Sequence, residues 1–273
     1  MTVCIGAICE GGKIVLVATD RMWTNPYLSI EYEYPEPKIE ILSPTCVAAI
    51  AGSVILPTEA IERVREKVHR KGIRNISDIA YAIKEEYIKE RNKRIDDEVF
   101  KPRGLSMDDF YKKGVQRVLD SSLIRMLDSQ VERYEFELII LVGGVDKKGH
   151  LYVIFPPGRI EPFERVGYVS IGSGRPHVES TFILERYTPR LPLDQALYLV
   201  YKAKKIAERA PGVGPSTDIV VITEKKAEYL PDDIKEELQN IYNSEISIMV
   251  NRKKLTEKLE KMVKEFRSES LEV

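Results

Sequence analysis

Cysteine, histidine and tryptophan are scarce in this chain of 273 residues, which has three, three and one of them. The cysteines are Cys4, Cys9 and Cys46, and the histidines are His69, His150 and His177. Neither set has the spacing of a zinc site, and an odd number of cysteines within apolar runs does not suit a disulfide framework. We therefore expect buried, reduced cysteines, no metal and no cofactor.

An excess of charge of one sign is also missing, since 42 basic residues stand against 43 acidic ones. This balance provides no general attraction to nucleic acid. No apolar run approaches the ~18 residues of a membrane span, and the first residues lack the basic and apolar regions of a signal peptide. We expect a cytoplasmic protein that binds neither nucleic acid nor a membrane.

Alternating and continuous apolar runs predict several strands. Residues 2–9 and 13–19 form strands joined by a Glu10-Gly11-Gly12 turn, and residues 38–42 and 46–51 form a second hairpin. We expect these four strands in one sheet, with residues 22–37, rich in Pro, Tyr and Asn, as a surface loop. Further strands at residues 136–145, 151–155, 166–171 and 218–223 are expected to form a second sheet.

Helical periodicity separates these strand groups. Helices are predicted at residues 57–71, after a cap at Ser77, from a capped start at Ser106 to about Val131, and at residues 178–187 and 193–210. This order predicts an α/β (α+β) fold in which two sheets lie between helical layers, a four-layer αββα sandwich. Beyond residue 225 we expect a helix at 231–242, a short strand at 246–250 and an amphipathic helix near 255–266.

Thr2 is a candidate nucleophile if Met1 is removed, because a free amino-terminal threonine carries a hydroxyl and an amine base on one residue. An α-amino group titrates near pH ~8, so much of it is neutral and can accept the hydroxyl proton. A nearby lysine keeps the amine neutral and favours the alkoxide, and a carboxylate fixes the lysine. Lys38 and Asp20 can fill these roles. The backbone N–H of Gly52, at the end of an apolar run, suits the oxyanion.

Six segments, in this order, resemble the motifs of proteasome β-type subunits, which are N-terminal nucleophile (Ntn) hydrolases. They are Thr2-Val3-Cys4-Ile5-Gly6, Ala18-Thr19-Asp20-Arg21, Lys38-Ile39-Glu40-Ile41, Ala51-Gly52-Ser53, Ser170-Ile171-Gly172-Ser173-Gly174 and Thr217-Asp218-Ile219-Val220-Val221-Ile222-Thr223. Each motif alone has little specificity, but together they cover most of residues 2–223. The resemblance implies the Ntn hydrolase sandwich fold.

The resemblance also implies functional residues. The implied catalytic set is Thr2, Asp20, Lys38, Gly52 and Ser173. The residues implied to bind substrate are Ile50, Val54 and Arg21. Gly174 is a further implied site residue, in the loop that touches the amino terminus. Because Ile50 and Val54 are apolar, we expect cleavage after medium-sized apolar residues.

Two positions depart from the family pattern. Ala210 stands where the family has an aspartate, with Glu208 nearby as a candidate substitute. Arg175-Pro176 follows the serine loop where a second serine is common. Within one domain spanning residues 1–273, the chain also has a helical insertion at about 96–133 and a C-terminal extension at about 225–273. The insertion could be a lid, a ring contact or a lengthened helical layer, and the extension could bind a partner or pack on the domain.

The implied function is that of a hydrolase, a threonine protease. Its substrates would be peptides or unfolded proteins, and its assembly a homo-oligomeric ring, with an ATP-dependent unfoldase as a further partner. Two alternatives stay open: a catalytically inactive structural subunit with the same fold, which Ala210 favours, and an Ntn amidase acting on a small amide.

Overall fold

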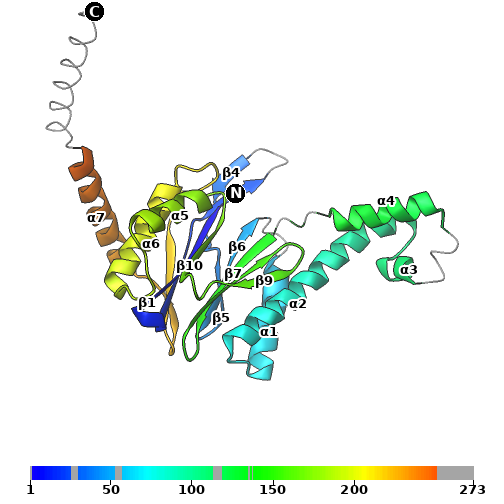
Figure 1. Ribbon diagram of the computed structural model, residues 1–273, viewed down its shortest axis with the longest axis horizontal. Helices are drawn as coiled ribbons and strands as arrows, with labels where there is room; N and C mark the ends of the chain where they lie inside the picture. Colours follow the sequence, from blue (N-terminus) through cyan, green and yellow to red (C-terminus); the bar gives the residue numbers. More distant parts are fainter. Residues whose placement is uncertain are drawn as a thin grey trace, which may run out of the picture. The chain divides into compact units, whose positions relative to one another are not determined.

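The fold is built on two five-stranded antiparallel sheets (Figure 1). The computed structural model describes residues 2–25, 30–52, 57–112, 119–134, 136 and 138–250. The chain divides into two compact units, Met1–Tyr229 and Leu230–Val273. Both sheets belong to the first unit, so the candidate site does too.

The first sheet has β1 and β2 near its middle. In spatial order its strands are β10 (Tyr168–Gly172), β1 (Val3–Cys9), β2 (Ile14–Thr19), β11 (Asp218–Ile222) and β12 (Ala227–Tyr229). A short 3-10 turn, η1 (Glu10–Gly12), joins β1 to β2 at the Gly-Gly pair, as the sequence predicts. β1 is buried along its whole length, which matches its continuous apolar run.

The second sheet consists of β5 (Ile39–Ser43), β6 (Cys46–Gly52), β7 (Leu138–Val145), β8 (Gly149–Phe155) and β9 (Arg159–Pro162), in that order. The prediction that the four amino-terminal strands share one sheet is therefore wrong. β10 and β11 also join β1 and β2 rather than β7 and β8. Apolar patterning shows which strands are buried, but strands buried on both faces do not reveal their partners.

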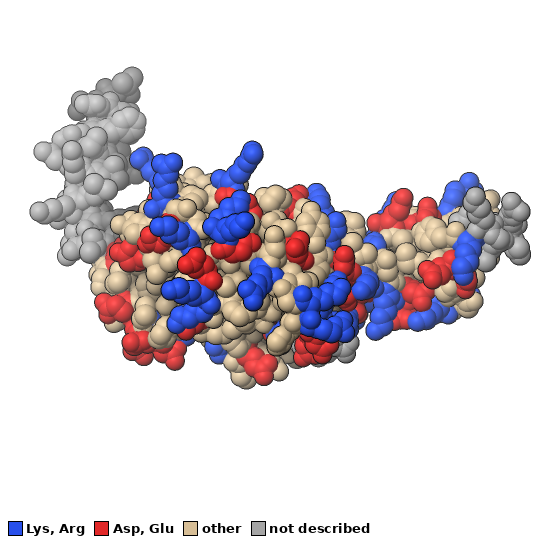
Figure 2. Space-filling view, turned by 90° about the horizontal axis from the view of Figure 1, so that it is seen from below, with Lys and Arg blue, Asp and Glu red and all other residues tan. Residues whose placement is uncertain are grey.

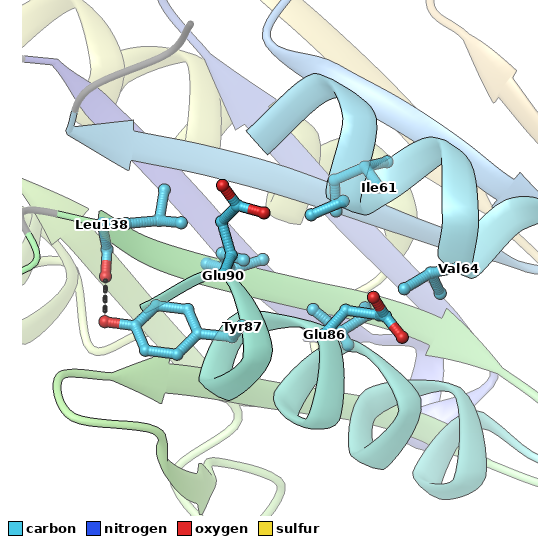
Figure 3. Close-up of a pocket in the computed structure, with 9 residues that line it drawn as sticks. Ile61, Val64, Glu86, Tyr87, Glu90 and Leu138 are labelled. Atoms are coloured by element: carbon cyan, nitrogen blue, oxygen red, sulfur yellow. Dashed lines mark hydrogen bonds between the residues drawn. The ribbon is translucent and has the colours of Figure 1, made fainter. Parts of the chain in front are cut away.

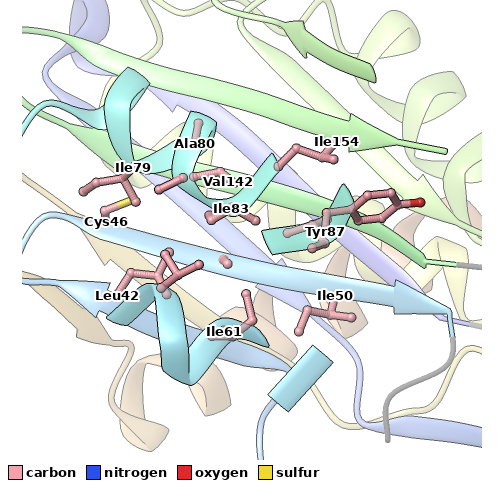
Figure 4. Close-up of a cluster of buried hydrophobic side chains, with 14 of the residues drawn as sticks. Leu42, Cys46, Ile50, Ile61, Ile79, Ala80, Ile83, Tyr87, Val142 and Ile154 are labelled. Atoms are coloured by element: carbon pink, nitrogen blue, oxygen red, sulfur yellow. The ribbon is translucent and has the colours of Figure 1, made fainter. Parts of the chain in front are cut away.

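Helices cover the outer face of each sheet, so the predicted four-layer αββα sandwich is confirmed. α1 (Pro57–Lys71) and α2 (Ile76–Ile95) pack on the second sheet, and α5 (Arg175–Leu184) and α6 (Leu193–Ala207) pack on the first. Figure 4 shows Ile61 of α1 and Ile83 of α2 against the second sheet. A separate core between the sheets includes Val17 and Leu141.

The cap of α2 differs from the prediction by two residues. Asn75, rather than Ser77, is the N-cap: it has extended backbone, and its side chain accepts a hydrogen bond of 2.9 Å from the Ser77 N–H. Both residue types cap helices well, so the sequence left the position of the first turn ambiguous.

The sequence predicted residues 22–37 as a surface loop, but part of this segment forms strands. β3 (Met22–Asn25) and β4 (Ile30–Glu33) pair as a two-stranded antiparallel ribbon. Trp23 and Tyr32 favour strands, but nearby prolines and the exposure of β4 hid the pattern.

The region predicted as an insertion contains more than one helix. α2 runs into a π-helical turn, η2 (Asp96–Phe100), and a 3-10 turn, η3 (Lys101–Arg103), before α3 (Met107–Tyr111) and α4 (Ser121–Glu132). Ser106 caps α3 as predicted, but the predicted single helix to Val131 is wrong, because Lys112 is extended and Asp120 caps α4. A small core around Phe100, Phe110 and Leu127 holds these turns together.

The second unit contains one described helix, α7 (Asp232–Val250). It replaces the strand predicted at residues 246–250, because adding residues to an existing helix is more favourable than the weak β preference of this short run. The predicted helix near 255–266 lies outside the described residues. Among those that are described, no helix is long and apolar enough to cross a membrane. On the face in Figure 2, basic and acidic side chains are interspersed.

A charged cluster connects the β7–β8 turn to α2 and to the segment after β9. The imidazole of His150 is 2.9 Å from Asp146 Oδ1 through Nε2 and 2.5 Å from Glu164 Oε1 through Nδ1. Asp146 also accepts a hydrogen bond from the Ile76 N–H at 3.2 Å, and Lys148 binds Glu164 at 2.9 Å. His150 itself is buried. His150 thus joins the β7–β8 hairpin to the segment after β9, while Asp146 joins this hairpin to the start of α2.

The two carboxylates of this cluster make stability depend on pH. Burial raises the pKa of both, but hydrogen bonds from Ile76 and His150 to Asp146, and from Lys148 and His150 to Glu164, outweigh burial and lower both pKa values below their ordinary range. A carboxylate whose pKa is lower in the folded state than in the unfolded state stabilises the protein at pH values above the unfolded-state pKa. That contribution is lost as the pH falls through the folded pKa.

We therefore expect Asp146→Asn to reduce the loss of unfolding free energy between pH ~5 and pH ~3. Urea unfolding of the wild type and the variant across this range measures the difference. Glu161→Gln is a matched control, because Glu161 is more exposed and pairs only with Arg159 among the described contacts. Equal pH slopes for the wild type and Asp146→Asn would show that the cluster contributes no such stability.

Candidate active site

Thr2, Asp20, Lys38 and Ser173 meet at one end of the two sheets. Thr2 directly precedes β1, Asp20 follows β2 and Ser173 follows β10, and the antiparallel pairing of β1 with both neighbours brings these ends together. Lys38 directly precedes β5 in the facing sheet. Thr2, Asp20 and Lys38 are at most 5% exposed. The sequence prediction thus named side chains that the fold brings into contact.

The Thr2 hydroxyl lies between a cation and a carboxylate. Lys38 Nζ donates a hydrogen bond of 2.7 Å to Thr2 Oγ1, and Thr2 Oγ1 donates to Asp20 Oδ1. Lys38 Nζ also donates to Asp20 Oδ1 at 3.2 Å and to the carbonyl of Met22, so each of its three hydrogens has an acceptor. A buried ammonium fixed in this way can stabilise an alkoxide on Oγ1.

Asp20 is a fully buried carboxylate with a complete set of donors. Besides Lys38, the backbone N–H groups of Val3, Met22 and Gly214 each donate to it at 3.0 Å. Buried ion pairs need such additional hydrogen bonds to offset the loss of hydration. Asp20 is therefore a rigid anchor for Lys38.

The serine loop holds the backbone of Thr2. The Thr2 nitrogen donates to Ser173 Oγ at 3.3 Å, and the Gly174 N–H donates to the Thr2 carbonyl at 3.2 Å. Ser173 Oγ in turn lies 3.0 Å from the Pro211 carbonyl and can donate its hydrogen there. Gly172 has a φ of +91°, and a Cβ on it would lie 2.2 Å from the Thr2 carbonyl oxygen, so the close approach requires glycine.

Gly52 and Ile50 lie on β6, which ends next to the start of β1. The Cys4 thiol donates to the Ile50 carbonyl at 3.4 Å, which brings the two segments together. Gly52 is exposed, with a φ of +116°. The side chain of Ile50 points into the core between the second sheet and α1 (Figure 4). Val54 lies outside the described residues.

A narrow pocket opens on the helical side of the second sheet. Ile61 and Val64 of α1, Glu86, Tyr87 and Glu90 of α2, and Leu138 of β7 are among its lining residues (Figure 3). Leu138 and Ile140, which also line it, pair with Gly52 and Ile50 across the sheet. Arg63 forms ion pairs with Glu86 and Glu90 at 3.2 and 3.1 Å. The pocket is thus mostly apolar and adjoins the strand that carries the predicted oxyanion donor.

Comparison with known proteins is consistent with this geometry. A family model described as "Proteasome subunit" matches residues 111–222. A protein of Methanocorpusculum labreanum described as "Proteasome subunit beta" is 35% identical over 97 residues. This chain is therefore similar to proteasome subunits over part of its length. The aligned region covers 34% of this chain and 44% of that relative, so the chain spans less than half of the relative's length.

The family match begins after Thr2, Asp20 and Lys38 in the sequence, while β7, β8, β10 and β11 lie within it. The similarity therefore supports the fold and the β-type family. The assignment of roles to the amino-terminal residues depends on the geometry described above.

Ala210 stands where the family pattern has an aspartate, and the nearby Glu208 is engaged by two lysines. Ala210 is buried. Among the described residues, Glu208 has its ion pairs with Lys204 at 2.6 Å and Lys205 at 2.8 Å and has no hydrogen bond with Thr2. The Pro211 carbonyl instead accepts a hydrogen bond from Ser173. The backbone carbonyl of the residue that follows Ala210 thus partners the serine.

Arg21, predicted to bind substrate, is engaged in a structural ion pair. Its Nε and Nη2 donate to Asp218 at 2.7 and 2.6 Å, and Nη1 donates to the Pro35 carbonyl at 2.7 Å. The hydrogen bonds to Asp218 raise the pKa of Arg21. This bidentate pair joins the end of β2 to β11, next to Asp20.

Cys4 lies close to the hydroxyl of Thr2 but is a poor rival nucleophile. Complete burial, with a contribution from Asp20, raises the pKa of its thiol to about 12 despite the neighbouring Lys38. Because the thiolate is the reactive form, this thiol stays unreactive near neutral pH.

Sequence reasoning missed Lys204 and Gly214. Gly214 donates to Asp20, and the Lys204 ammonium bonds to the Gly214 carbonyl at 2.8 Å. A signal for Lys204 was present: its position in α6 is three or four residues from Val200, Tyr201 and Ala207, all of which are buried. A lysine on the apolar face of a helix indicates a buried charge with specific partners.

Proposed function

We propose that this chain is a threonine peptidase of the proteasome type, in which Thr2 becomes the nucleophile once Met1 is removed. The observation that carries the proposal is the contact of 2.7 Å between Lys38 Nζ and Thr2 Oγ1. Asp20 holds Lys38 in place by accepting a hydrogen bond from the same Nζ. Met1 lies outside the described residues. We place the reaction in the cytoplasm, where buried free thiols such as Cys4, Cys9 and Cys46 stay reduced.

In the proposed reaction, Oγ1 of Thr2 attacks the carbonyl carbon of a peptide bond. The free amine of Thr2 takes the hydroxyl proton, Lys38 stabilises the developing charge on Oγ1, and the Gly52 N–H stabilises the oxyanion. The protonated amine then gives its proton to the leaving nitrogen as the C–N bond breaks. Water, deprotonated by the same amine, hydrolyses the resulting ester and restores Thr2.

The proposed substrates are peptides or unfolded proteins with a medium-sized apolar residue before the cleaved bond. This specificity rests on Ile50 and on the largely apolar pocket that Ile61, Leu138 and Ile140 help to line. A panel of fluorogenic peptides that differ in this one residue tests both the activity and the preference. Cleavage mainly after acidic or basic residues would refute the specificity, and no cleavage of any peptide or of unfolded casein would refute the peptidase.

Ser173→Ala should lower kcat/KM by about fivefold to tenfold, because a hydrogen bond of about 1 kcal/mol that positions the Thr2 amine is lost. The measurement is the hydrolysis of the best peptide of the panel. Ser170→Ala is the matched control, because the Ser170 hydroxyl faces the Arg175 carbonyl at 3.5 Å rather than Thr2. Equal rates for the two variants would remove Ser173 from the site.

We further propose that the chain forms a homo-oligomeric ring that receives substrates from an ATP-dependent unfoldase. Ile183 and Leu184 of α5 are 66% and 79% exposed, and Val166 is 53% exposed, so apolar side chains are available for subunit contacts. Multi-angle light scattering at micromolar concentration should give a mass several times that of one chain. A monomer under these conditions would contradict the assembly but not the chemistry.

A catalytically inactive subunit is the second candidate, and Ala210 favours it because the family aspartate is missing. The two candidates differ in one property: a covalent threonine probe should label only an active subunit. An amidase for a small amide differs from the peptidase in substrate alone, so the peptide panel separates them.

A further inference from the structure

Lys204 is a fully buried ammonium outside the set of residues assigned so far. It lies in the last turn of α6, and its Nζ donates to Glu208 Oε1 at 2.6 Å and to the carbonyls of Gly214 and Pro215 at 2.8 and 2.9 Å. These three acceptors satisfy its three hydrogens. A buried cation with this complete set of partners is expensive to desolvate, so its position calls for a specific reason.

The Gly214 residue connects Lys204 to the active site. Its carbonyl accepts from Lys204, while its N–H donates to Asp20 Oδ2 at 3.0 Å. Asp20 in turn holds Lys38, which contacts the Thr2 hydroxyl. One backbone residue thus links two buried charges that are far apart in sequence.

Glu33 also holds the loop that carries Gly214. Glu33 of β4 accepts from the Ser216 N–H at 2.9 Å and from the Ser216 hydroxyl at 2.6 Å. A Cβ on Gly214 would lie 2.4 Å from Glu33 Oε1 and 3.0 Å from the Met22 Cβ, so the packing leaves little room for movement. Glu33 and Lys204 therefore both hold this loop, through Ser216 and through the carbonyls of residues 214 and 215.

We propose that Lys204 is a positioning residue of the Thr2 site, which holds Gly214 so that its N–H orients Asp20 and, through it, Lys38. The inference rests on the proposed peptidase function. It gives a lysine of α6 a supporting role in the site. This lysine lies close in sequence to Ala210, where the expected aspartate is absent. The pKa of Lys204 is lowered, because burial outweighs the opposing effects of Glu208 and Asp20.

Lys205 offers a matched control. Its ammonium binds the other oxygen of Glu208, Oε2, at 2.8 Å, and its side chain is 15% exposed. Lys204→Met and Lys205→Met each remove one positive charge from Glu208, but only Lys204→Met removes the donors to the 214–215 carbonyls. Both variants are compared with the wild type in peptide hydrolysis and in hydrogen–deuterium exchange of residues 211–217.

We expect Lys204→Met to lower kcat by about tenfold with KM within about twofold, because substrate contacts are unchanged while the reacting groups lose their geometry. Exchange in residues 211–217 should become faster. Lys205→Met should change neither quantity by more than about twofold. Equal behaviour of the two variants in both measurements would overturn the proposal, as would faster exchange with unchanged kcat in an active protein.

Lys204→Met leaves Glu208 Oε1 and the carbonyls of Gly214 and Pro215 without the Lys204 donor and could prevent folding. In that case the double variant Lys204→Gln/Glu208→Gln is used, because a glutamine amide still donates to the carbonyls while the ion pair is replaced by neutral groups. Its kcat should fall less than about threefold if loop positioning is the role of Lys204. A loss as large as that expected for Lys204→Met in a folded double variant would overturn that role.

Failure of the proposed function gives a different result. If the wild type hydrolyses no peptide and binds no covalent threonine probe, the peptidase is wrong. The exchange experiment still decides whether Lys204 holds the 211–217 segment against Asp20. Unchanged exchange in a folded Lys204→Met variant would then refute the structural part of the inference.

Discussion

Thr2→Ala should abolish peptide hydrolysis and the covalent mass gain from an epoxyketone or β-lactone probe, while the protein still folds and assembles. The hydroxyl is the attacking group, so its removal leaves no nucleophile on this residue. One small buried side chain contributes little to a core of this size, and folding should therefore survive. Peptide hydrolysis, probe labelling and light scattering measure the three properties.

Thr2→Ser is the matched control, because it keeps the hydroxyl beside Lys38 and removes only a methyl group. It should retain probe labelling and measurable hydrolysis. Unchanged turnover in Thr2→Ala would eliminate the threonine mechanism and leave the structural subunit as the better candidate.

Lys38→Ala should have the second largest effect, a loss of about a thousandfold or more in kcat, because the cation beside Thr2 Oγ1 disappears. The same change should destabilise the protein by about 3–5 kcal/mol, since Asp20 stays buried without its ammonium partner. Steady-state kinetics and urea unfolding at the same pH measure the two effects.

The double variant Asp20→Asn/Lys38→Met separates stability from catalysis. Removing both charges should recover much of the unfolding free energy, because no unpaired buried charge remains, while kcat should stay as low as in Lys38→Ala. Recovery of hydrolysis in the double variant would show that Lys38 acts only by keeping the protein folded.

The sequence predicted the local elements of this fold better than their pairing. Continuous apolar runs identified β1 and β2, and helical periodicity identified α1 at residues 57–71. Which strands pair was not predictable in this way, because β10 and β11 join β1 and β2 across more than a hundred residues. Such pairings depend on how whole layers pack, and burial patterns do not record them.

For the candidate site, the sequence could indicate the side chains whose type the chemistry requires. A threonine nucleophile requires a cation and a carboxylate, and Lys38 and Asp20 indeed contact Thr2. Backbone partners could not be foreseen, because the Pro211 carbonyl and the Gly214 N–H have no signature in the sequence. Glu208, close in sequence to the missing aspartate, has its carboxylate bound by Lys204 and Lys205, an engagement that its position in the sequence does not reveal.

The most direct test of the threonine mechanism is the intact mass of the purified protein before and after treatment with an epoxyketone probe. The mechanism requires that the untreated protein lack Met1, since an acylated Thr2 nitrogen cannot act as a base. It also predicts one probe adduct per chain, located on Thr2 by peptide mapping and absent from Thr2→Ala. A hydrolytically active protein that retains Met1, or an adduct on any residue other than Thr2, would contradict the mechanism.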